Sequence, residues 1–215
     1  MRRRQHPRPE GVPEEEIAAR PDSMYYVIFV GAGNEAKTEQ LIRRAVSEEL
    51  CSEYFHPVRH MKKKIRGEWR HVYEKILPGY VFVESGDIAA LHKALIRTPC
   101  FKKILRTEAE DGSFDFYALT QSEVNWLMSV CGRLGETEKI LPVIELTQVG
   151  FDESDKVRVL SGPLKGREAM VKKIDLHRRT AEIEVDFMGR PVVLRVGIEI
   201  IKKEGPQSGD PGVSG

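Results

Sequence analysis

Histidine and cysteine are the side chains in this sequence best suited to metal binding or nucleophilic catalysis, and their spacing supports neither. The six histidines are His6, His56, His60, His71, His92 and His177. None lies in the helical motif of a zinc protease, and no serine or cysteine stands in the strand-to-helix turn of an activated nucleophile. The cysteines are odd in number, widely spaced and without a close histidine: Cys51, Cys100 and Cys131. We therefore expect reduced core cysteines, no zinc site, no disulfide framework, no cofactor and no enzyme activity.

One glycine-rich loop resembles a dinucleotide-binding turn. Gly31-Ala32-Gly33 stands between an apolar run and a helical pattern, where a phosphate would meet exposed backbone N–H groups. Ala36 occupies the place of the third glycine, and no second strand with an acidic residue follows in a βαβ unit. We interpret the loop as an ordinary turn.

Lysine and arginine provide the remaining chemistry, which is contact with phosphate. The net charge is only +1, so any nucleic-acid site must be local. Three local groups stand out. The first is on an expected helix (Lys37, Arg43, Arg44), the second on an expected hairpin (Lys62, Lys63, Lys64, Arg66), and the third near the C-terminus (Arg158, Lys165, Arg167, Lys172, Lys173, Arg178, Arg179, Arg190). The first group also fits a solvated helix face, whereas the density of the other two favours phosphate contact.

The elements that position these side chains begin at Met24. The run Tyr25–Val30 predicts a strand, and Leu41, Ile42, Ala45, Val46 and Leu50 recur at helical spacing after it. Two basic stretches, Val58–Ile65 and Trp69–Ile76, predict a hairpin closed by Gly67. Pro78-Gly79 predicts a turn before the apolar strand from Tyr80 to Val83.

Two helix starts are marked by capping residues. Ser85 or Asp87 precedes the apolar stripe of Ile88, Leu91, Ala94 and Leu95, and this helix is expected to end near Pro99. Thr120 and Glu123 form a capping box for a helix that reaches Val130. Between the two helices, Phe101, Ile104 and Leu105 indicate another strand.

From residue 154 the pattern is entirely β. About five short alternating runs, of which Thr180–Asp186 is the clearest, predict a small curved barrel. We therefore expect two domains in an α+β chain. The expected segments are a disordered extension at 1–23, an α/β domain at 24–132, a linker at 133–153, a barrel at 154–203 and a flexible tail at 204–215.

The composition, 40% hydrophobic and 31% charged, is that of a soluble globular protein. No apolar run approaches the length of about 20 residues that a membrane helix needs, and no signal peptide is visible. These features predict a cytoplasmic protein without a membrane partner.

The run from Val157 to Val171, with its Gly162-Pro163 turn and Gly166, is the pattern of a KOW domain and closely resembles the C-terminal domain of the NusG family. The aromatic first strand, Pro78-Gly79-Tyr80-Val81, Thr98-Pro99 and the capped helix at Thr120 follow in the order of that family's N-terminal domain. The resemblance covers Tyr25 to about Lys202. It implies a four-stranded antiparallel sheet flanked by helices, linked to a KOW barrel.

The same resemblance implies a transcription elongation factor that binds the β′ clamp helices of RNA polymerase through an apolar pocket. By match to the family's motifs, the pocket residues are Tyr25, Leu77, Tyr80, Phe82 and Phe101. Burial in the core is the simpler explanation for Phe82, and it is weaker for Leu77 and Tyr80 beside an exposed turn. Lys37, Arg43 and Arg44 stand where RfaH-type relatives touch the non-template DNA strand, and the basic hairpin is expected to approach upstream DNA or polymerase.

Three residues depart from housekeeping members of the family. Met188 replaces a usual aromatic, and Lys172-Lys173 replaces a commonly acidic pair. These departures are similar to the LoaP subfamily, which implies processive antitermination and a KOW domain that recognises an RNA hairpin. Because the barrel carries few exposed aromatics, we expect recognition of structured leader RNA rather than base stacking.

Two other interpretations remain open. One is a housekeeping NusG that contacts a ribosomal protein or a termination factor, and the other is a ribosomal or rRNA-binding KOW protein. The second leaves the domain around Pro78-Gly79-Tyr80 unexplained. In each case we expect a monomer.

Overall fold

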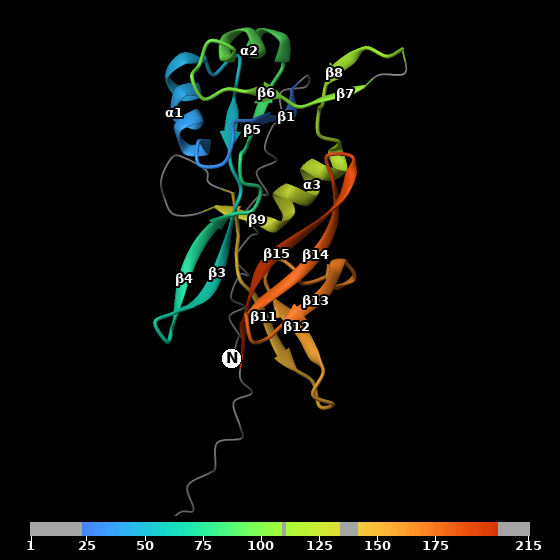
Figure 1. Ribbon diagram of the computed structural model, residues 1–215. Helices are drawn as coiled ribbons and strands as arrows, with labels where there is room; N and C mark the ends of the chain where they lie inside the picture. The colour runs from blue at the N-terminus through green and yellow to red at the C-terminus, as the bar shows by residue number, and fades with distance from the viewer. Residues whose placement is uncertain (1–22, 109–110, 134–141, 202–215) are drawn as a thin grey trace, which may run out of the picture.

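The computed structural model describes residues 23–108, 111–133 and 142–201. The described chain is elongated: a helix-covered sheet lies at one end, a barrel at the other, and one helix between them (Figure 1). Apart from Ser23, the expected extension at 1–23 and the expected tail at 204–215 lie outside the described residues. No helix in the described ranges is both long and apolar enough to cross a membrane.

The N-terminal domain is built on a four-stranded antiparallel sheet in the order β2-β5-β1-β6. Its strands are β1 (Met24–Phe29), β2 (Glu53–Phe55), β5 (Tyr80–Ser85) and β6 (Lys103–Ile104). Alternate residues point to opposite faces, so Ile28, Val81 and Val83 pack under the first two helices while Val27 and Phe82 face the other way. The sheet and its helices confirm the expected α+β fold class.

Three helices accompany this sheet: α1 (Glu35–Ala45), α2 (Ile88–Leu95) and α3 (Gln121–Val130). The side chain of Asp87 accepts a hydrogen bond from the Ala90 N–H at the start of α2. At the start of α3, Thr120 and Glu123 form both bonds of the capping box. The sequence predicted both helix starts correctly because caps are local hydrogen-bonding patterns.

The inward face of α1 differs from the expected apolar stripe. The helix ends at Ala45, and its buried residues are Glu35, Thr38, Glu39 and Ile42. Val46 and Leu50 follow the helix and pack partly against the same core. Polar residues occupy the buried face because each acid has a hydrogen-bond partner on a neighbouring element, as the site geometry below makes clear.

A long hairpin leaves the sheet and runs beside the barrel. It consists of β3 (Val58–Ile65) and β4 (Glu68–Lys75), and Arg66 and Gly67 close it with φ angles of +52° and +89°. The strand β10 (Pro142–Ile144) pairs in parallel with β3, and β9 (Cys131–Arg133) pairs with β10. A smaller hairpin of β7 (Arg106–Glu108) and β8 (Phe114–Phe116) projects from the sheet end of the molecule (Figure 1).

The C-terminal domain is a curved five-stranded sheet in the order β12-β11-β15-β14-β13. The strands are β11 (Thr147–Phe151), β12 (Val157–Ser161), β13 (Val171–Asp175), β14 (Thr180–Phe187) and β15 (Arg190–Ile200), with a short 3₁₀ turn, η1 (Glu168–Met170), before β13. Ala181, Ile183 and Val185 are buried as their alternation predicted.

The barrel takes in residues that the sequence placed in the linker. The strand β11 lies within 133–153, yet it pairs with β12 and in parallel with β15. A Cβ atom on Gly150 would lie 2.9 Å from the Leu160 side chain, so glycine lets β12 pack closely here. Glycine weakened the alternation from which the strand would have been predicted.

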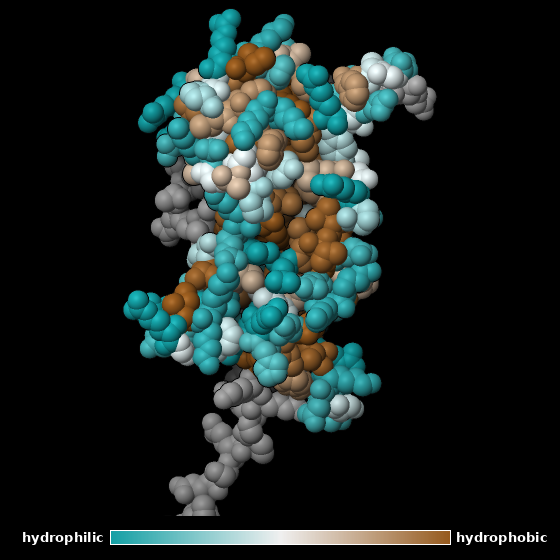
Figure 2. Space-filling model, viewed as in Figure 1, coloured by the Kyte–Doolittle hydropathy of each residue, from teal (hydrophilic) through white to brown (hydrophobic). Residues whose placement is uncertain are grey.

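The second face of the N-terminal sheet is covered by α3 and the barrel, and one hydrophobic core spans both domains. That core contains Val27, Phe55 and Phe82 from the sheet together with Leu127 from α3 and Phe187 from β14. Apolar side chains gather over α3 and the neighbouring end of the β14–β15 hairpin (Figure 2). The two domains are therefore docked.

Candidate functional site

Four of the five apolar residues expected to bind polymerase lie on the barrel side of the N-terminal sheet. Tyr25 and Phe82 belong to this face, while Leu77 and Tyr80 pack at its border beside the Pro78-Gly79 turn. We call Tyr25, Phe55, Leu77, Tyr80 and Phe82 the aromatic face. Phe55 joins it with its ring centroid 5.5 Å from Phe82 and 6.2 Å from Tyr25.

The fifth residue, Phe101, is not part of this group. Its ring packs 5.6 Å from His92 against the core beneath α1 and α2. Phe101 follows α2 and reaches the helix-covered face of the sheet, so the structure separates it from the other four.

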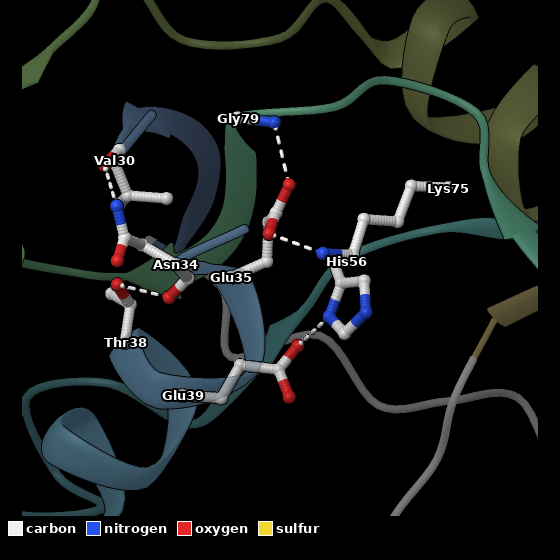
Figure 3. Close-up of polar contacts among 8 residues, drawn as sticks. All are labelled: Val30, Asn34, Glu35, Thr38, Glu39, His56, Lys75 and Gly79. Carbon is white, nitrogen blue, oxygen red and sulfur yellow. Dashed lines mark hydrogen bonds and ion pairs between the residues drawn. The ribbon is translucent and has the colours of Figure 1, made fainter. Parts of the chain in front are cut away.

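The turn that carries Leu77 and Tyr80 is held by a buried carboxylate (Figure 3). Glu35, fully buried in the first turn of α1, accepts hydrogen bonds from the Gly79 N–H at 2.7 Å and from Lys75 Nζ at 2.5 Å. Gly79 has φ +92°, and a Cβ there would lie 3.1 Å from the Ala32 backbone nitrogen, so only glycine fits. Burial alone would raise the pKa of Glu35, but the bonds from Lys75 and Gly79 outweigh it and lower the pKa.

A second buried acid on α1 supports the neighbouring strand. Glu39 lies 2.6 Å from Nδ1 of His56, just after β2 (Figure 3). The glycine loop before α1 is closed on itself, since Asn34 Nδ2 donates to the Val30 carbonyl oxygen at 3.1 Å. With the Glu35 carboxylate buried at the same helix start, a phosphate would meet a negative charge there, which supports the interpretation of the loop as a turn.

Replacing Glu35 by alanine is expected to destabilise the fold by about 2–3 kcal/mol, because the buried Gly79 N–H loses its acceptor and Lys75 its partner. Urea unfolding measures the loss. The matched control is Glu35→Gln, which keeps an acceptor for Gly79 and is expected to cost about 1 kcal/mol. Equal losses for the two variants would mean that the hydrogen bond to Gly79 contributes nothing.

The barrel places one ring on the aromatic face. The centroid of Phe187, at the end of β14, lies 5.8 Å from Phe82 and 5.7 Å from Trp126 of α3. Next to it, the Met188 N–H donates to Glu123 Oε1 at 2.5 Å. Met188 thus sits at the domain contact, with its backbone at φ +55°.

A second contact joins the barrel to the long hairpin. Gly197 of β15 lies so close to β3 that a Cβ atom would be 2.3 Å from the His60 carbonyl oxygen and 3.2 Å from the Met61 Cα. Arg59 Nη1 donates to the Arg195 carbonyl oxygen at 2.6 Å, and Lys62 forms an ion pair with Glu199. The docked arrangement therefore depends on a glycine and on polar bonds as well as on Phe187.

Acidification is expected to loosen this docking through Glu123. Burial would raise its pKa, but bonds from Thr120, Tyr117 and the Met188 N–H outweigh it and lower the pKa below the usual 4.5. Only the Met188 bond comes from the barrel, and by favouring the ionised carboxylate this bond acts to lower the pKa of Glu123 in the docked form. The linked stabilisation is present above the undocked pKa and is lost as pH falls through the docked pKa, below about 4.5.

Trp126 fluorescence in a Trp69→Phe background measures that loss, since Trp126 contacts Phe187 and the chain has two tryptophans. Glu123→Gln retains an acceptor without the charge and should remove this pH dependence. An unchanged profile in Glu123→Gln would exclude Glu123 as its source.

Two histidines come together that the sequence did not pair. His60 Nε2 lies 2.7 Å from His71 Nδ1, and His60 Nδ1 lies 2.6 Å from Glu145. His60 also stacks on Tyr73 at 4.6 Å. In the part of the chain that the structure describes, no three histidine, cysteine or acidic side chains are placed to hold a metal ion.

The basic candidates separate into distinct surfaces. Lys37, Arg43 and Arg44 are exposed on α1, away from the others. On the hairpin, Lys63 forms an ion pair with Glu74, whereas Lys64 and Arg66 are exposed. The α1 group and the hairpin group therefore lie at the surface on separate elements.

The barrel candidates are similarly divided. Several have partners within the barrel: Arg158 with Asp152 at 2.9 Å, Lys172 with Glu184 at 2.8 Å, Arg178 with Asp175 at 3.8 Å, Lys165 with the Val159 carbonyl oxygen at 3.1 Å and Arg167 with that of Pro163 at 3.3 Å. Lys173 and Arg190 are exposed. Arg179 leaves the group, because its guanidinium lies 4.5 Å from the centroid of Trp69 on the hairpin.

Sequence reasoning missed Phe55, Trp126 and Phe187. A signal existed for Phe187, which continues the buried phase of residues 181, 183 and 185 beyond the end assigned to that strand. No local signal indicated that its ring reaches the other domain.

Comparison with known proteins gives consistent matches in both domains. Residues 23–128 match the family model described as transcription termination factor nusG, and residues 153–186 match the KOW motif. A relative from Borreliella burgdorferi, named transcription termination/antitermination protein NusG, is 23% identical over 198 residues, covering 83% of this chain and 97% of its own. The protein of the same name from Thermus thermophilus is 28% identical over 142 residues, covering 64% of this chain and 72% of its own. A solved structure of Thermotoga maritima NusG superposes with a TM-score of 0.43 at 20% identity, over 80% of this chain and 93% of that one.

The order of the two matches along the chain agrees with the two domains of the structure, a helix-flanked antiparallel sheet followed by a five-stranded barrel. This chain belongs to the NusG family of transcription factors.

Proposed function

We propose that this protein binds the clamp helices of RNA polymerase through its aromatic face and promotes antitermination after recruitment by a leader RNA hairpin. The observation that carries the proposal is the position of Phe187. The aromatic face is covered by α3 and by Phe187 of the barrel, whose neighbour Met188 donates a hydrogen bond to Glu123. At the other end of the β14–β15 hairpin, Gly197 makes a separate contact with β3. If the barrel moved away, this apolar surface would be exposed, and exposed apolar patches are typical of binding sites for other proteins.

The polymerase site proposed here requires the barrel to move away. In the docked arrangement Phe187 occupies the position that an apolar side chain of the clamp helices would take. Polymerase and the barrel then compete for the same face, and the affinity for polymerase depends on the undocked fraction. Undocking also exposes Phe187 and the partly buried Met188 at the end of the barrel where Arg190 is already exposed.

The RNA half of the proposal rests on the basic residues of the barrel. Lys173 and Arg190 are exposed, and Lys172 lies on β13 with its ion-pair partner Glu184 at the surface. Phosphate contacts of this type give affinity that falls with salt. The preference for antitermination over a housekeeping role rests on Met188 and Lys172-Lys173, as in the LoaP subfamily.

Reversing the charge at both lysines of β13 tests the RNA half. Lys172→Glu/Lys173→Glu in the full chain is expected to weaken binding of the cognate leader hairpin and to reduce the slope of log affinity against log salt by about two. The matched control is Lys93→Glu/Arg97→Glu at α2, which changes the net charge equally. An unchanged salt slope in the β13 variant would remove these lysines from the RNA site.

Transcription in vitro tests the whole proposal. With polymerase and a template that carries leader and terminator, we expect the protein to increase read-through, and deletion of the leader hairpin to abolish the increase. Unchanged read-through refutes antitermination. Tight binding to a ribosomal protein or termination factor without preference for any hairpin indicates a housekeeping NusG, and cofractionation with ribosomes but never with polymerase indicates a ribosomal KOW protein.

A further inference from the structure

We infer that the docked protein binds single-stranded nucleic acid in a groove made by both domains. The groove has a volume of about 370 Å³ and lies between the β3–β4 hairpin and the β13–β14 turn, with β15 along its side. In Figure 2 the hairpin and the adjoining barrel surface are mostly hydrophilic. We call this surface the composite groove. It joins hairpin residues that the sequence assigned to DNA with barrel residues that it assigned to RNA.

The lining of the composite groove is basic. The lining contains six lysines and arginines, one histidine and a single carboxylate, Glu74. The basic residues are Arg59, Lys62, Lys63, Lys64, Arg178, Arg195 and His177. Three of these basic side chains also form ion pairs with acids outside the lining: Lys62 with Glu199, Arg178 with Asp175 and Arg195 with Glu182. Positive charge is still in excess, because Lys64 makes no ion pair within the described residues, and Arg59 and Lys63 share Glu74. Such a lining suits a ligand with several negative charges in a row.

One donor in the groove lacks a partner. Arg59 Nε is buried with no hydrogen-bond acceptor among the described residues, although Nη1 and Nη2 of the same guanidinium have partners. A buried donor without an acceptor is costly, and an anion reaching Arg59 would supply one. The guanidinium fork is suited to phosphate oxygens.

The groove also contains an aromatic side chain. Trp69 of β4 is 38% exposed, and the guanidinium of Arg179, which precedes β14, lies 4.5 Å from its ring centroid. The cation holds the indole in place between the domains. Proteins bind single-stranded nucleic acid with an exposed aromatic ring beside a row of basic side chains. A nucleobase stacks on the ring, and the cationic side chains contact the phosphates along the strand. A duplex offers no unstacked base to Trp69.

The composite groove exists only while the domains are docked. Its walls come from residues about 120 positions apart in the chain, and the close approach of Gly197 to His60 and the Arg59–Arg195 bond hold them together. Movement of the barrel from the aromatic face would separate Trp69 from Arg179. Binding in the groove and docking are therefore coupled, and each strengthens the other.

The inference deepens the proposed function. It rests on the proposed function in one respect only, namely that the single strand comes from the leader RNA. The hairpin of that RNA is assigned to β13, and the composite groove takes an unpaired flank. Because polymerase needs the undocked form, capture of polymerase would release the flank from the groove. Binding of the flank in the composite groove and binding of polymerase to the aromatic face therefore oppose each other.

Fluorescence anisotropy with a labelled uridine decamer, a strand without a hairpin, tests the groove in the full-length protein. Lys64→Glu from one wall and Arg178→Glu from the other are each expected to weaken binding about tenfold and to reduce the salt slope by about one or more. Trp69→Ala is expected to weaken it about 5- to 100-fold, and Trp69→Phe to restore part of the affinity. Lys93→Glu, an equal charge change on α2, should bind like the unmodified protein.

Docking dependence separates the composite groove from a basic hairpin acting alone. Gly197→Val, which alters no lining residue, is expected to weaken decamer binding as much as Arg178→Glu does. Phe187→Asp, acting at the other domain contact, provides a second undocked variant if Gly197→Val fails to fold. Circular dichroism checks folding, and Trp126 fluorescence checks docking.

The outcomes are distinct. Three results would each overturn the inference. The first is equal decamer binding by Gly197→Val and the unmodified protein, and the second is equal weakening by Lys93→Glu and Lys64→Glu. The third is no binding of either a uridine or a thymidine decamer. Equal binding of both decamers supports recognition through phosphates and stacking, and a preference for uridine adds a contact to the ribose. Decamer binding without any read-through activity would leave the inference standing and remove the proposed function; read-through without decamer binding would do the reverse.

Discussion

Gly197→Val is expected to raise the affinity of the full-length protein for RNA polymerase by about 10- to 100-fold. The reason lies in the contact between β15 and β3. A Cβ atom at position 197 would lie 2.3 Å from the His60 carbonyl oxygen and 2.6 Å from the Leu146 side chain. Because His60 O belongs to the backbone of a paired strand, the strain is relieved by separating the barrel from the hairpin rather than by a rotamer change.

The size of the effect follows from the docking equilibrium. If polymerase binds only the undocked form, the apparent affinity is the intrinsic affinity multiplied by the undocked fraction. A docked state favoured by about 1.4–2.8 kcal/mol leaves about 1–10% of the protein undocked. Abolishing docking therefore raises the apparent affinity for polymerase by about 10- to 100-fold.

Binding of polymerase to immobilised protein, measured as a dissociation constant, checks this result. Gly189→Val at the β14–β15 turn is unsuitable as a control because φ there is +70°. The matched control is Val193→Ile, an exposed position of the same strand, which should leave the affinity unchanged. A Gly197→Val protein that is undocked by Trp126 fluorescence and yet binds polymerase no better would contradict competition between the barrel and polymerase.

Leu77→Asp is expected to weaken polymerase binding about 30-fold, or by about 2 kcal/mol, when introduced into the Gly197→Val protein. Leu77 is partly buried at the border of the aromatic face, beside the turn held by Glu35. An aspartate there must either lose water at the interface with polymerase or keep a hydrated gap in it, and both reduce affinity. The undocked background matters because Leu77→Asp in the docked protein would also affect contacts with the core.

Tyr80→Ala in the same background should act in the same direction, since Tyr80 shares this border and its ring centroid lies 5.3 Å from that of Phe29. Ile96→Asp supplies the matched control, because Ile96 is 61% exposed after α2 and lies away from the aromatic face. Equal losses for Leu77→Asp and Ile96→Asp would show that the loss comes from added negative charge. Unaltered affinity in Leu77→Asp would remove Leu77 from the polymerase site.

Docking of the barrel on the N-terminal domain accounts for two residue pairs that are far apart in the sequence. Phe187 and Gly197 are on the barrel, Phe82 and His60 on the N-terminal domain, and each pair is in contact. The proposed polymerase site and the proposed composite groove would respond to docking in opposite ways, because opening would expose the first and take apart the second. A partner of one site therefore weakens binding at the other, which is a reciprocal coupling.

The sequence by itself determined the local elements. The β3–β4 turn, the caps of α2 and α3 and the alternation of β14 were all predicted, because each depends on residues within a few positions of one another. The run from Val157 to Val171 and the motif at Pro78-Gly79 were enough to indicate the family. Burial of Glu35 and Glu39 was missed, because charged residues are assigned to the surface unless their partners are known.

The tertiary structure alone decided which remote side chains meet. No periodicity relates Phe187 to Phe82 or Trp69 to Arg179, since such contacts depend on how the two domains pack. The same packing brought basic residues of the hairpin and of the barrel to one groove, and it placed Phe101 on the helix-covered face. It also placed the partly exposed indole of Trp69 beside a barrel that carries few exposed aromatics of its own, and no feature of the barrel's sequence could have indicated this.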